Sequence, residues 1–208
     1  MKKGILITMA IAIPIVIVMI IIGMSYFFTQ YSKQKVSEQK SMLNTEGVNT
    51  ETRKGAEGNN IYTKNFGSYE LPKNWIESKE HSTTKKFLYI LQGDEKNVKP
   101  NNIAINFGTN RYSKEEHEKF RRAILNQIST QIAGEKGTKI NANGSTTNNG
   151  DIVYTFIVKE STGITTVQYY IVGDYKYILI QETVFEESEE IDNVAKGMVN
   201  TFRWNDKY

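Results

Sequence analysis

Residues 151–184 read DIVYTFIVKESTGITTVQYYIVGDYKYILIQETV, and this stretch decides the fold of the chain. Three runs rich in Val, Ile, Tyr and Phe follow one another in it: Asp151–Lys159, Ile164–Val172 and Tyr175–Val184. Runs of this composition between turn residues predict β-strands, and the two-residue link Gly173-Asp174 predicts a tight hairpin turn. Apolar residues occur at both odd and even positions, so both faces of the sheet need a cover. The stretch therefore predicts an antiparallel sheet packed on both sides.

Two helical segments are predicted to pack on this sheet. The first, Ser113–Ala133, begins with Ser113 and Glu116 at the spacing of a capping box, which satisfies two backbone donors at a helix start. Its apolar residues recur every four positions: Phe120, Ile124, Ile128 and Ile132. The second, Ser188–Phe202, has an apolar face of its own: Ile191, Val194, Ala195, Met198, Val199 and Phe202. Such stripes are typical of helices that bury one face against a core.

Shorter strands are predicted outside the central stretch: Ile61–Leu71, Lys86–Gln92, Asn102–Phe107 and Thr138–Thr147. The last of them is polar, which favours a place at the edge of the sheet. Pro72 cannot donate to a strand ladder, so Leu71–Trp75 predicts a turn that follows a strand. We expect Trp75 to fold back from this turn into the core.

An uncharged apolar run, Ile5–Phe28, lies near the start of the sequence. As a helix it would rise about 36 Å, which is enough to cross a hydrocarbon core of about 30 Å. We therefore expect a transmembrane anchor within residues 1–28. Lys2 and Lys3 precede the run, so the positive-inside rule places the N-terminus in the cytoplasm and the rest of the chain outside. A cleaved signal peptide, with its cleavage site near Gly23, is the alternative.

The next segment, residues 29–60, is rich in Gln, Ser, Lys, Asn, Thr, Glu and Gly and shows no convincing hydrophobic period. Such a segment cannot bury enough apolar surface to offset its ordering entropy. It therefore predicts a flexible polar linker, with an r.m.s. reach of about 30 Å. The remaining residues, 61–208, have the length of one domain, which we expect to lie outside the cell membrane.

The composition excludes several classes of protein. Lys and Arg number 26 against 23 Asp and Glu, and without Lys2 and Lys3 the balance is 24 against 23. Nucleic-acid binders usually show a concentrated basic excess, so we expect no nucleic acid among the partners. The sequence has no cysteine, which excludes disulfides, thiolate metal sites, a cysteine nucleophile and a lipid-modified cysteine. With only two histidines as well, we expect neither a metal nor a cofactor.

Neither histidine lies in a catalytic or metal-binding motif. A zinc helix needs a second histidine four residues after the first, and Arg121 stands at that place relative to His117. We expect His117 to be a solvated residue of a first helical turn. His81 lies in a polar stretch between Glu80 and Ser82. No catalytic residue is therefore predicted.

An acidic cluster surrounds the start of the second helix: Glu182, Glu186, Glu187, Glu189, Glu190 and Asp192. Carboxylates favour the positive N-terminal end of a helix dipole, which accounts for the cluster without a ligand. The alternative is a calcium site, which needs oxygens spaced as in D-x-D-x-D-G loops. The sequence lacks that spacing.

Tyrosine is abundant, with 12 residues in the sequence, and four of them gather in the predicted hairpin: Tyr169, Tyr170, Tyr175 and Tyr177. Cross-strand packing is the ordinary role of tyrosines in a sheet. If exposed, Tyr169, Tyr175 and Tyr177 would form an interaction patch, because tyrosine is enriched at protein interfaces. These three are the candidate site residues that the sequence offers.

Three landmarks along the sequence resemble a known superfamily. They are Tyr69-Glu70-Leu71-Pro72-x-x-Trp75, Gly173-Asp174-Tyr175-Lys176-Tyr177-Ile178-Leu179 and Thr201-Phe202-Arg203-Trp204. In this order, with a helix between the first two, the chain resembles the PsbP/Mog1-like superfamily over Ile61–Trp204, including exported bacterial members of the DcrB-like type. The resemblance implies an α+β fold, in which helices sandwich an antiparallel β-sheet in an α-β-α arrangement. It also implies an accessory or binding subunit of a membrane assembly, generally without catalysis.

We therefore expect a membrane-tethered, extracytoplasmic and non-catalytic domain that binds another envelope protein or a cell-wall component. Two alternatives stay open at this point. One is an envelope hydrolase or metal-dependent enzyme that uses His81 or the acidic cluster. The other is a structural spacer close to the cell wall.

Overall fold

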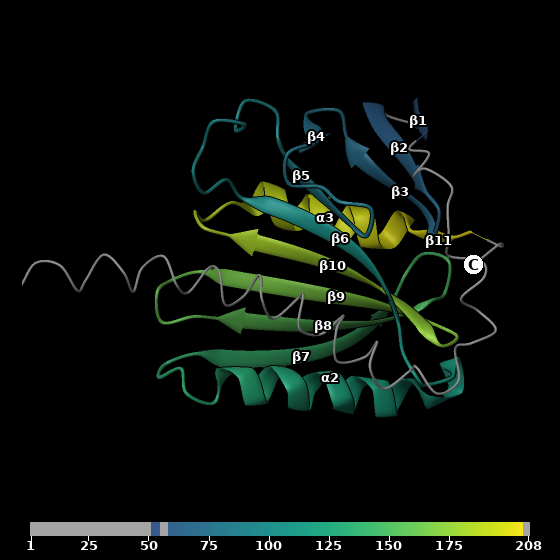
Figure 1. The fold of residues 1–208 in the computed structure, drawn as a ribbon, viewed down its shortest axis with the longest axis vertical. Helices are drawn as coiled ribbons and strands as arrows, with labels where there is room; N and C mark the ends of the chain where they lie inside the picture. Colours follow the sequence, from purple (N-terminus) through teal and green to yellow (C-terminus); the bar gives the residue numbers. More distant parts are fainter. Residues whose placement is uncertain (1–50, 55–57, 206–208) are drawn as a thin grey trace, which may run out of the picture. The chain divides into compact units, whose positions relative to one another are not determined.

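The computed structural model describes residues 51–54 and 58–205, whose strands form two antiparallel sheets (Figure 1). The seven-stranded sheet has the order β4 (Trp75–Glu77), β5 (Lys86–Leu91), β6 (Asn102–Thr109), β10 (Lys176–Val184), β9 (Thr165–Gly173), β8 (Ile152–Lys159) and β7 (Lys139–Thr146). The four-stranded sheet has the order β1 (Glu51–Lys54), β2 (Asn59–Lys64), β3 (Gly67–Pro72) and β11 (Arg203–Trp204). A short 3₁₀ turn, η3 (Lys114–Glu116), leads into α2 (His117–Ile132), and α3 is Glu189–Thr201.

Most strands and both helices predicted from periodicity are confirmed, with small shifts at their ends, whereas the predicted strand Ile61–Leu71 is a hairpin of β2 and β3. Strands β8, β9 and β10 are the three runs of the central stretch, and β7 is an edge strand as predicted. The helix before β7 begins as predicted at Ser113, whose backbone N–H donates to Glu116 Oε2 at 3.4 Å. The single predicted sheet is, however, two sheets, because the hairpin of β2 and β3 pairs with β11 and not with β10 or its neighbours.

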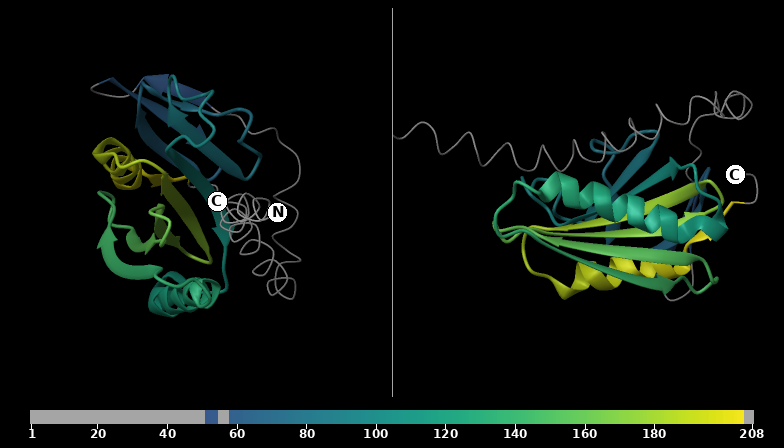
Figure 2. Two further views of the ribbon diagram at one scale, coloured as in Figure 1. Left: turned by 90° about the vertical axis from the view of Figure 1, so that its left-hand side faces the viewer. Right: turned by 90° about the horizontal axis from the view of Figure 1, so that it is seen from below.

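Helix α2 covers one face of the seven-stranded sheet. Phe120, Ile124 and Ile128 are its buried residues, as the stripe predicted. The ring of Phe120 lies 5.8 Å from that of Tyr170 in β9 and 5.4 Å from that of Tyr177 in β10. Figure 2 shows α2 and α3 on opposite sides of these strands. The expectation that helices cover both faces is therefore confirmed.

The other face of that sheet forms the larger core, together with α3 and the four-stranded sheet. The buried residues of α3 are those of the predicted apolar face: Ile191, Val194, Ala195, Met198 and Val199. Trp75 is 2% exposed and belongs to this core, as predicted. Thr201 at the end of α3 accepts a hydrogen bond of 3.1 Å from the backbone N–H of Glu70 in β3. Helix α3 is thus fixed to both sheets.

The hairpin turn between β9 and β10 lies one residue later than predicted. Gly173 pairs with Lys176, so the two turn residues are Asp174 and Tyr175. The glycine is needed inside the strand instead, because a Cβ on Gly173 would come within 3.0 Å of Trp204 and closer still to the Lys176 side chain. A glycine-based turn rule therefore placed the turn at the wrong residues.

The predicted linker is wrong over part of its length. Residues 51–54 form β1, and β2 begins at Asn59, although both lie within the segment 29–60. Strand pairing uses backbone groups that every residue carries, so a polar segment can join a sheet without a hydrophobic pattern. The rest of that segment up to residue 50, and the predicted anchor at residues 1–28, lie outside the described residues. Within the described ranges, neither α2 nor α3 is long and apolar enough to cross a bilayer.

Candidate functional site

The tyrosine patch predicted from the sequence does not exist as a surface. Tyr169 and Tyr177 are each 5% exposed, and they face opposite sides of the sheet. Tyr169 points to α3, where its hydroxyl donates to Asp192 Oδ1 at 3.4 Å, while Tyr177 packs on Phe120 of α2. Tyr175, by contrast, is 52% exposed. Tyr169 and Tyr177 are buried because side chains along a strand point alternately to the two faces of the sheet, and both faces are covered. Tyr175 is exposed because it lies in the turn.

Tyr175 has a left-handed backbone, with φ of 56°, and is the one non-glycine residue with positive φ among the described residues. Its backbone N–H donates to the carbonyl of Tyr112 at 3.0 Å, and its own carbonyl accepts from the N–H of Asn110 at 2.9 Å. A left-handed conformation costs a side-chain-bearing residue about 1–2 kcal/mol. These two bonds to the loop after β6 hold the conformation in place and present the ring to solvent.

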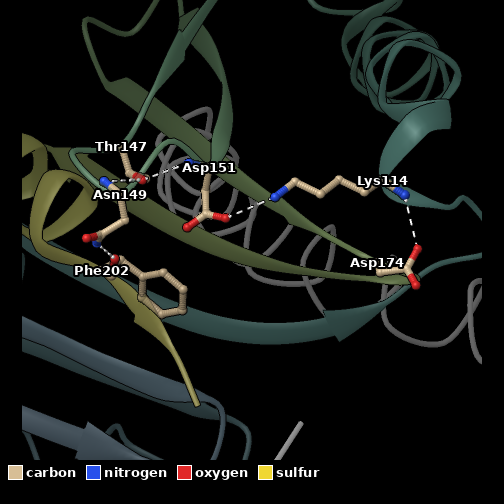
Figure 3. Close-up of polar contacts among 6 residues, drawn as sticks. All are labelled: Lys114, Thr147, Asn149, Asp151, Asp174 and Phe202. Atoms are coloured by element: carbon tan, nitrogen blue, oxygen red, sulfur yellow. Dashed lines mark hydrogen bonds and ion pairs between the residues drawn. The ribbon is translucent and has the colours of Figure 1, made fainter. Parts of the chain in front are cut away.

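Lys114 joins the three loops that meet beside Tyr175. Its backbone N–H donates to Asp174 Oδ1 at 3.1 Å, and its Nζ lies 3.4 Å from Asp151 Oδ1. Figure 3 shows the lysine reaching from the start of η3 to Asp151 at the start of β8. The side chain of Asp151 is 13% exposed and that of Lys114 is 45% exposed, so the pair lies at the surface. It connects the loop before α2 with two turns of the sheet.

The turn between β7 and β8 is tied to the end of α3 by a second set of contacts, also drawn in Figure 3. Thr147 Oγ1 accepts from the backbone N–H groups of Asn149 at 3.2 Å and Asp151 at 3.1 Å. Asn149 Nδ2 donates to the carbonyl of Phe202 at 2.7 Å. The asparagine therefore satisfies a carbonyl left without a partner at the helix end.

Lys176 completes the group of side chains at this end of the sheet. Its Nζ lies 4.7 Å from the centre of the Trp204 ring, a cation–π contact. Burial lowers the pKa of Lys176, while Asp174 and Asp151 oppose that effect. We call this group the hairpin-tip cluster; its members are Lys114, Asp151, Asp174, Tyr175, Lys176 and Trp204. It offers an exposed aromatic ring, a residue type enriched at protein interfaces, bordered by charges of both signs such as occur at the polar rim of an interface.

The expectation of a solvated His117 is wrong. Its Nδ1 lies 2.6 Å from the hydroxyl of Tyr154, which in turn donates to Glu118 Oε1 at 2.8 Å. Because the hydroxyl has one proton and gives it to Glu118, His117 Nδ1 is the donor of the first bond. Burial raises the pKa of Tyr154 to about 12, and Glu118 adds to the effect. These bonds fix the first turn of α2 to β8. The periodicity of the apolar residues in the helix does not predict this contact.

The two histidines are not brought together. His81 is exposed in the loop between β4 and β5, where its Nδ1 lies 3.0 Å from Ser78 Oγ. His117 contacts Tyr154 in β8, which is five places from β4 and four from β5 in the strand order. Four to five inter-strand spacings amount to about 19–24 Å. The structure thus supplies no shared site for these two imidazoles.

The acidic cluster is divided between the sheet and the helix. Glu189, Glu190 and Asp192 lie in the first turn of α3, where the helix dipole favours them. Glu182 is 2% exposed inside the sheet, and burial raises its pKa to about 7, with Asp192 adding to the rise and Lys196 opposing it. Over residues 51–54 and 58–205, no three His, Cys, Asp or Glu side chains converge to hold a metal ion.

Most of the hairpin-tip cluster was missed by sequence reasoning. Lys114 and Asp151 are 37 positions apart and belong to no motif, so only the fold brings them together. Trp204 pairs through β11 with β3, packs against the larger core and contacts Lys176, and no local pattern predicts this set of contacts. A signal was present in Gly173, since a glycine within a strand often marks close approach of another group.

No protein-family model matches the chain, and no curated protein matches it either. The structure is similar to cyanobacterial PsbP (CyanoP) from Synechocystis sp. PCC 6803, with a TM-score of 0.45 and 10% identity over 79% of this chain and 99% of that one. At this level of identity the similarity concerns the fold alone.

A second similar structure is a protein from Bacteroides thetaiotaomicron VPI-5482. The TM-score is 0.45 and the identity 12%, over 68% of this chain and 46% of that one. This chain therefore spans less than half of the length of that protein.

Proposed function

We propose that this protein is a membrane-tethered accessory domain that binds another envelope protein through the hairpin-tip cluster, without catalysis. The apolar run Ile5–Phe28 would provide the tether, and the domain would lie on the extracytoplasmic side. Tyr175 would be the central contact residue. Asp151, Asp174, Lys114 and Lys176 would surround it with charges of both signs.

The observation that carries the proposal is the exposed ring of Tyr175 on a left-handed backbone. Strained residues of this kind persist only where the surrounding structure over-determines them, and they cluster at functional sites. Here the bonds to Asn110 and Tyr112 provide that constraint. A glycine at position 175 would adopt the same backbone conformation without strain. Compared with glycine, the tyrosine adds only its side chain, so the exposed ring is the feature that offsets the strain.

The residues around Tyr175 fit the same role. Arg111 is exposed, and its guanidinium lies 5.2 Å from the ring centre of Tyr112. Tyrosine and arginine are enriched among the residues that dominate the energy of protein interfaces. The neighbouring loops are tied down by Lys114 and Asn149, so the surface is held in shape before a partner arrives. Such preorganisation reduces the entropy lost on binding.

The experiment is site-specific photo-crosslinking of the full chain in its native membranes. A benzophenone-bearing amino acid replaces Tyr175 in one variant and Val98, which is 93% exposed, in the control. We expect one protein to be captured from position 175 and not from position 98. Capture of the same proteins from both positions, or of none from position 175, would overturn the proposal and favour a structural spacer.

A second variant separates binding from folding. Tyr175→Gly keeps the left-handed backbone and removes the ring, so we expect the wild-type fold and the loss of the captured partner in a pull-down. Tyr175→Phe keeps the ring and should retain the partner. Equal recovery of the partner by Tyr175→Gly and wild type would show that this ring is not the contact.

A further inference from the structure

Among the described residues, the outer edge of β7 is an unpaired rim of the seven-stranded sheet, and it is well separated from Tyr175 in the chain. Strand β7 is the last in the strand order, with β8 as its neighbour (Figure 1). Every residue of Lys139–Thr146 is exposed except Ile140, which is half-buried. A strand in this position presents a row of N–H and C=O groups to solvent.

This rim lacks the features by which edge strands usually avoid pairing. Its register with β8 advances one residue at a time from Lys139–Lys159 to Thr146–Ile152, so it contains no bulge. It has no proline, and its one charged residue, Lys139, stands at the end of the strand. An edge of eight residues without bulge, proline or central charge is open to a further strand.

Helix α2 does not close the rim. Its buried residue Phe120 packs on Tyr170 in β9 and Tyr177 in β10, and the hydroxyl of Tyr154 in β8 bonds to Glu118. These contacts place the helix over the strands inward of β7. The exposure of Asn141, Asn143 and Ser145 agrees with this placement.

We propose that β7 pairs with β7 of a second copy of this chain, so that the two large sheets join across a two-fold axis. Antiparallel strand pairing is self-complementary, since residue i of one copy meets residue j of the other and the reverse holds. In such a pair the two Lys139 side chains lie at opposite ends of the seam and do not repel. Apart from the half-buried Ile140, the side chains along the seam are polar or small, so they need no apolar cover on either face.

The pairing has a restricted register. Along an edge, only every second residue directs its N–H and C=O outward, so the residues that exchange bonds with the partner have the same parity in both copies. The residue numbers of two opposed residues, one from each copy, therefore add up to an even number. Among the registers that this rule allows, the two with the most paired residues place either Ala142 opposite Ala142 or Asn143 opposite Asn143. One of these two residues therefore meets its own copy at the axis.

Cysteine crosslinking tests this register directly, because the chain has no cysteine of its own. Residues opposed in an antiparallel pair have Cα atoms about 4.5–5.5 Å apart, within the range that a disulfide spans. Ala142→Cys, Asn143→Cys and the control Val98→Cys are made in the full chain and oxidised in native membranes. The area of one strand pair is small, so we expect a weak association that covalent capture reveals.

We expect a disulfide-linked dimer from Ala142→Cys or Asn143→Cys, several-fold above that from Val98→Cys. Adding a lysine at the other seam position, as in Ala142→Cys with Asn143→Lys, should reduce the dimer by crowding like charges near the axis. A yield no higher than that of Val98→Cys at both positions would overturn the proposal. So would capture of a different protein at the seam, which would show that another chain occupies this edge.

Discussion

Lys64 Nζ lies 2.8 Å from Glu77 Oε2, and this ion pair connects the four-stranded sheet to the seven-stranded one. The lysine side chain is fully buried, whereas that of Glu77 is 22% exposed. The ammonium group also lies 3.8 Å above the ring of Phe87 in β5. Burial lowers the pKa of Lys64, and Glu77 opposes that effect. A buried cation is thus held where strands of the two sheets meet.

Removing the carboxylate should be more damaging than removing both charges. Glu77→Gln removes the carboxylate that lies 2.8 Å from the buried ammonium of Lys64, so we expect a loss of about 3 kcal/mol in the free energy of unfolding. Lys64→Met combined with Glu77→Gln should recover much of that loss. Urea unfolding measures both variants, with exposed Glu80→Gln as the control. A change below about 1 kcal/mol in Glu77→Gln would show that Lys64 reaches water in solution.

Glu182 should make stability depend on pH. Its pKa is about 7 in the folded chain against an ordinary value of 4.5 for a glutamate, so the folded state binds more protons between these pH values. The contribution of Glu182 to the free energy of unfolding therefore falls as the pH rises from 4.5 to about 7. Glu182→Gln should remove the dependence and be more stable than wild type at pH 8, by about 3 kcal/mol.

Thermal unfolding of both proteins at pH 5 and pH 8 measures this difference. Asp192→Asn, which removes the carboxylate that adds to the rise, should give a smaller effect of the same sign. Parallel pH profiles for wild type and Glu182→Gln would contradict the assignment.

Two glycine substitutions should act in opposite directions. A Cβ on Gly67 would meet the carbonyl of Arg203 and the ring of Phe202, so Gly67→Ala should destabilise the domain by about 1–3 kcal/mol. Gly197 lies inside α3 with open space around it, and Gly197→Ala should stabilise by about 0.5–1 kcal/mol. Melting temperatures of the two variants give the comparison, and a fall in both would argue against the open space at Gly197.

The hydroxyl of Tyr154 should stabilise the start of α2. Tyr154→Phe removes its bonds to His117 and Glu118, one of them to a carboxylate, so we expect a loss of about 1–2 kcal/mol. Hydrogen exchange should become faster in the first turn of α2 and not in α3. Unchanged exchange at residues 117–121 would indicate that the three groups are separately solvated.

Local pattern was enough for the elements that bury a regular stripe. Strands β8, β9 and β10 and helices α2 and α3 were predicted because their apolar residues repeat with the period of the structure. Strands β1 and β11 were missed since their pairing depends on partners elsewhere in the chain. Strand β11 has two residues, which is too short for any period to show.

Tyr175 is the one residue of the candidate site that the sequence predicted. Tyr175 was named from composition, together with Tyr169 and Tyr177, which alternation then buries in the sheet. What distinguishes it is its place in the turn, and this depends on Gly173 being held within β9 by the packing of Trp204. Three-dimensional packing, and not local propensity, therefore decides which tyrosine is exposed.

The pairing of β11 with β3 has a consequence for the order in which the protein can mature. Thr201 bonds to Glu70 across 131 positions, and Arg203 pairs with Ser68 just beyond it. A nascent chain leaves the ribosome from its N-terminal end, so β3 emerges long before the residues that complete its sheet. The hairpin of β2 and β3 can pack on β5 during synthesis, but its outer strand β3 gains its last partner only after the final helix has been synthesised.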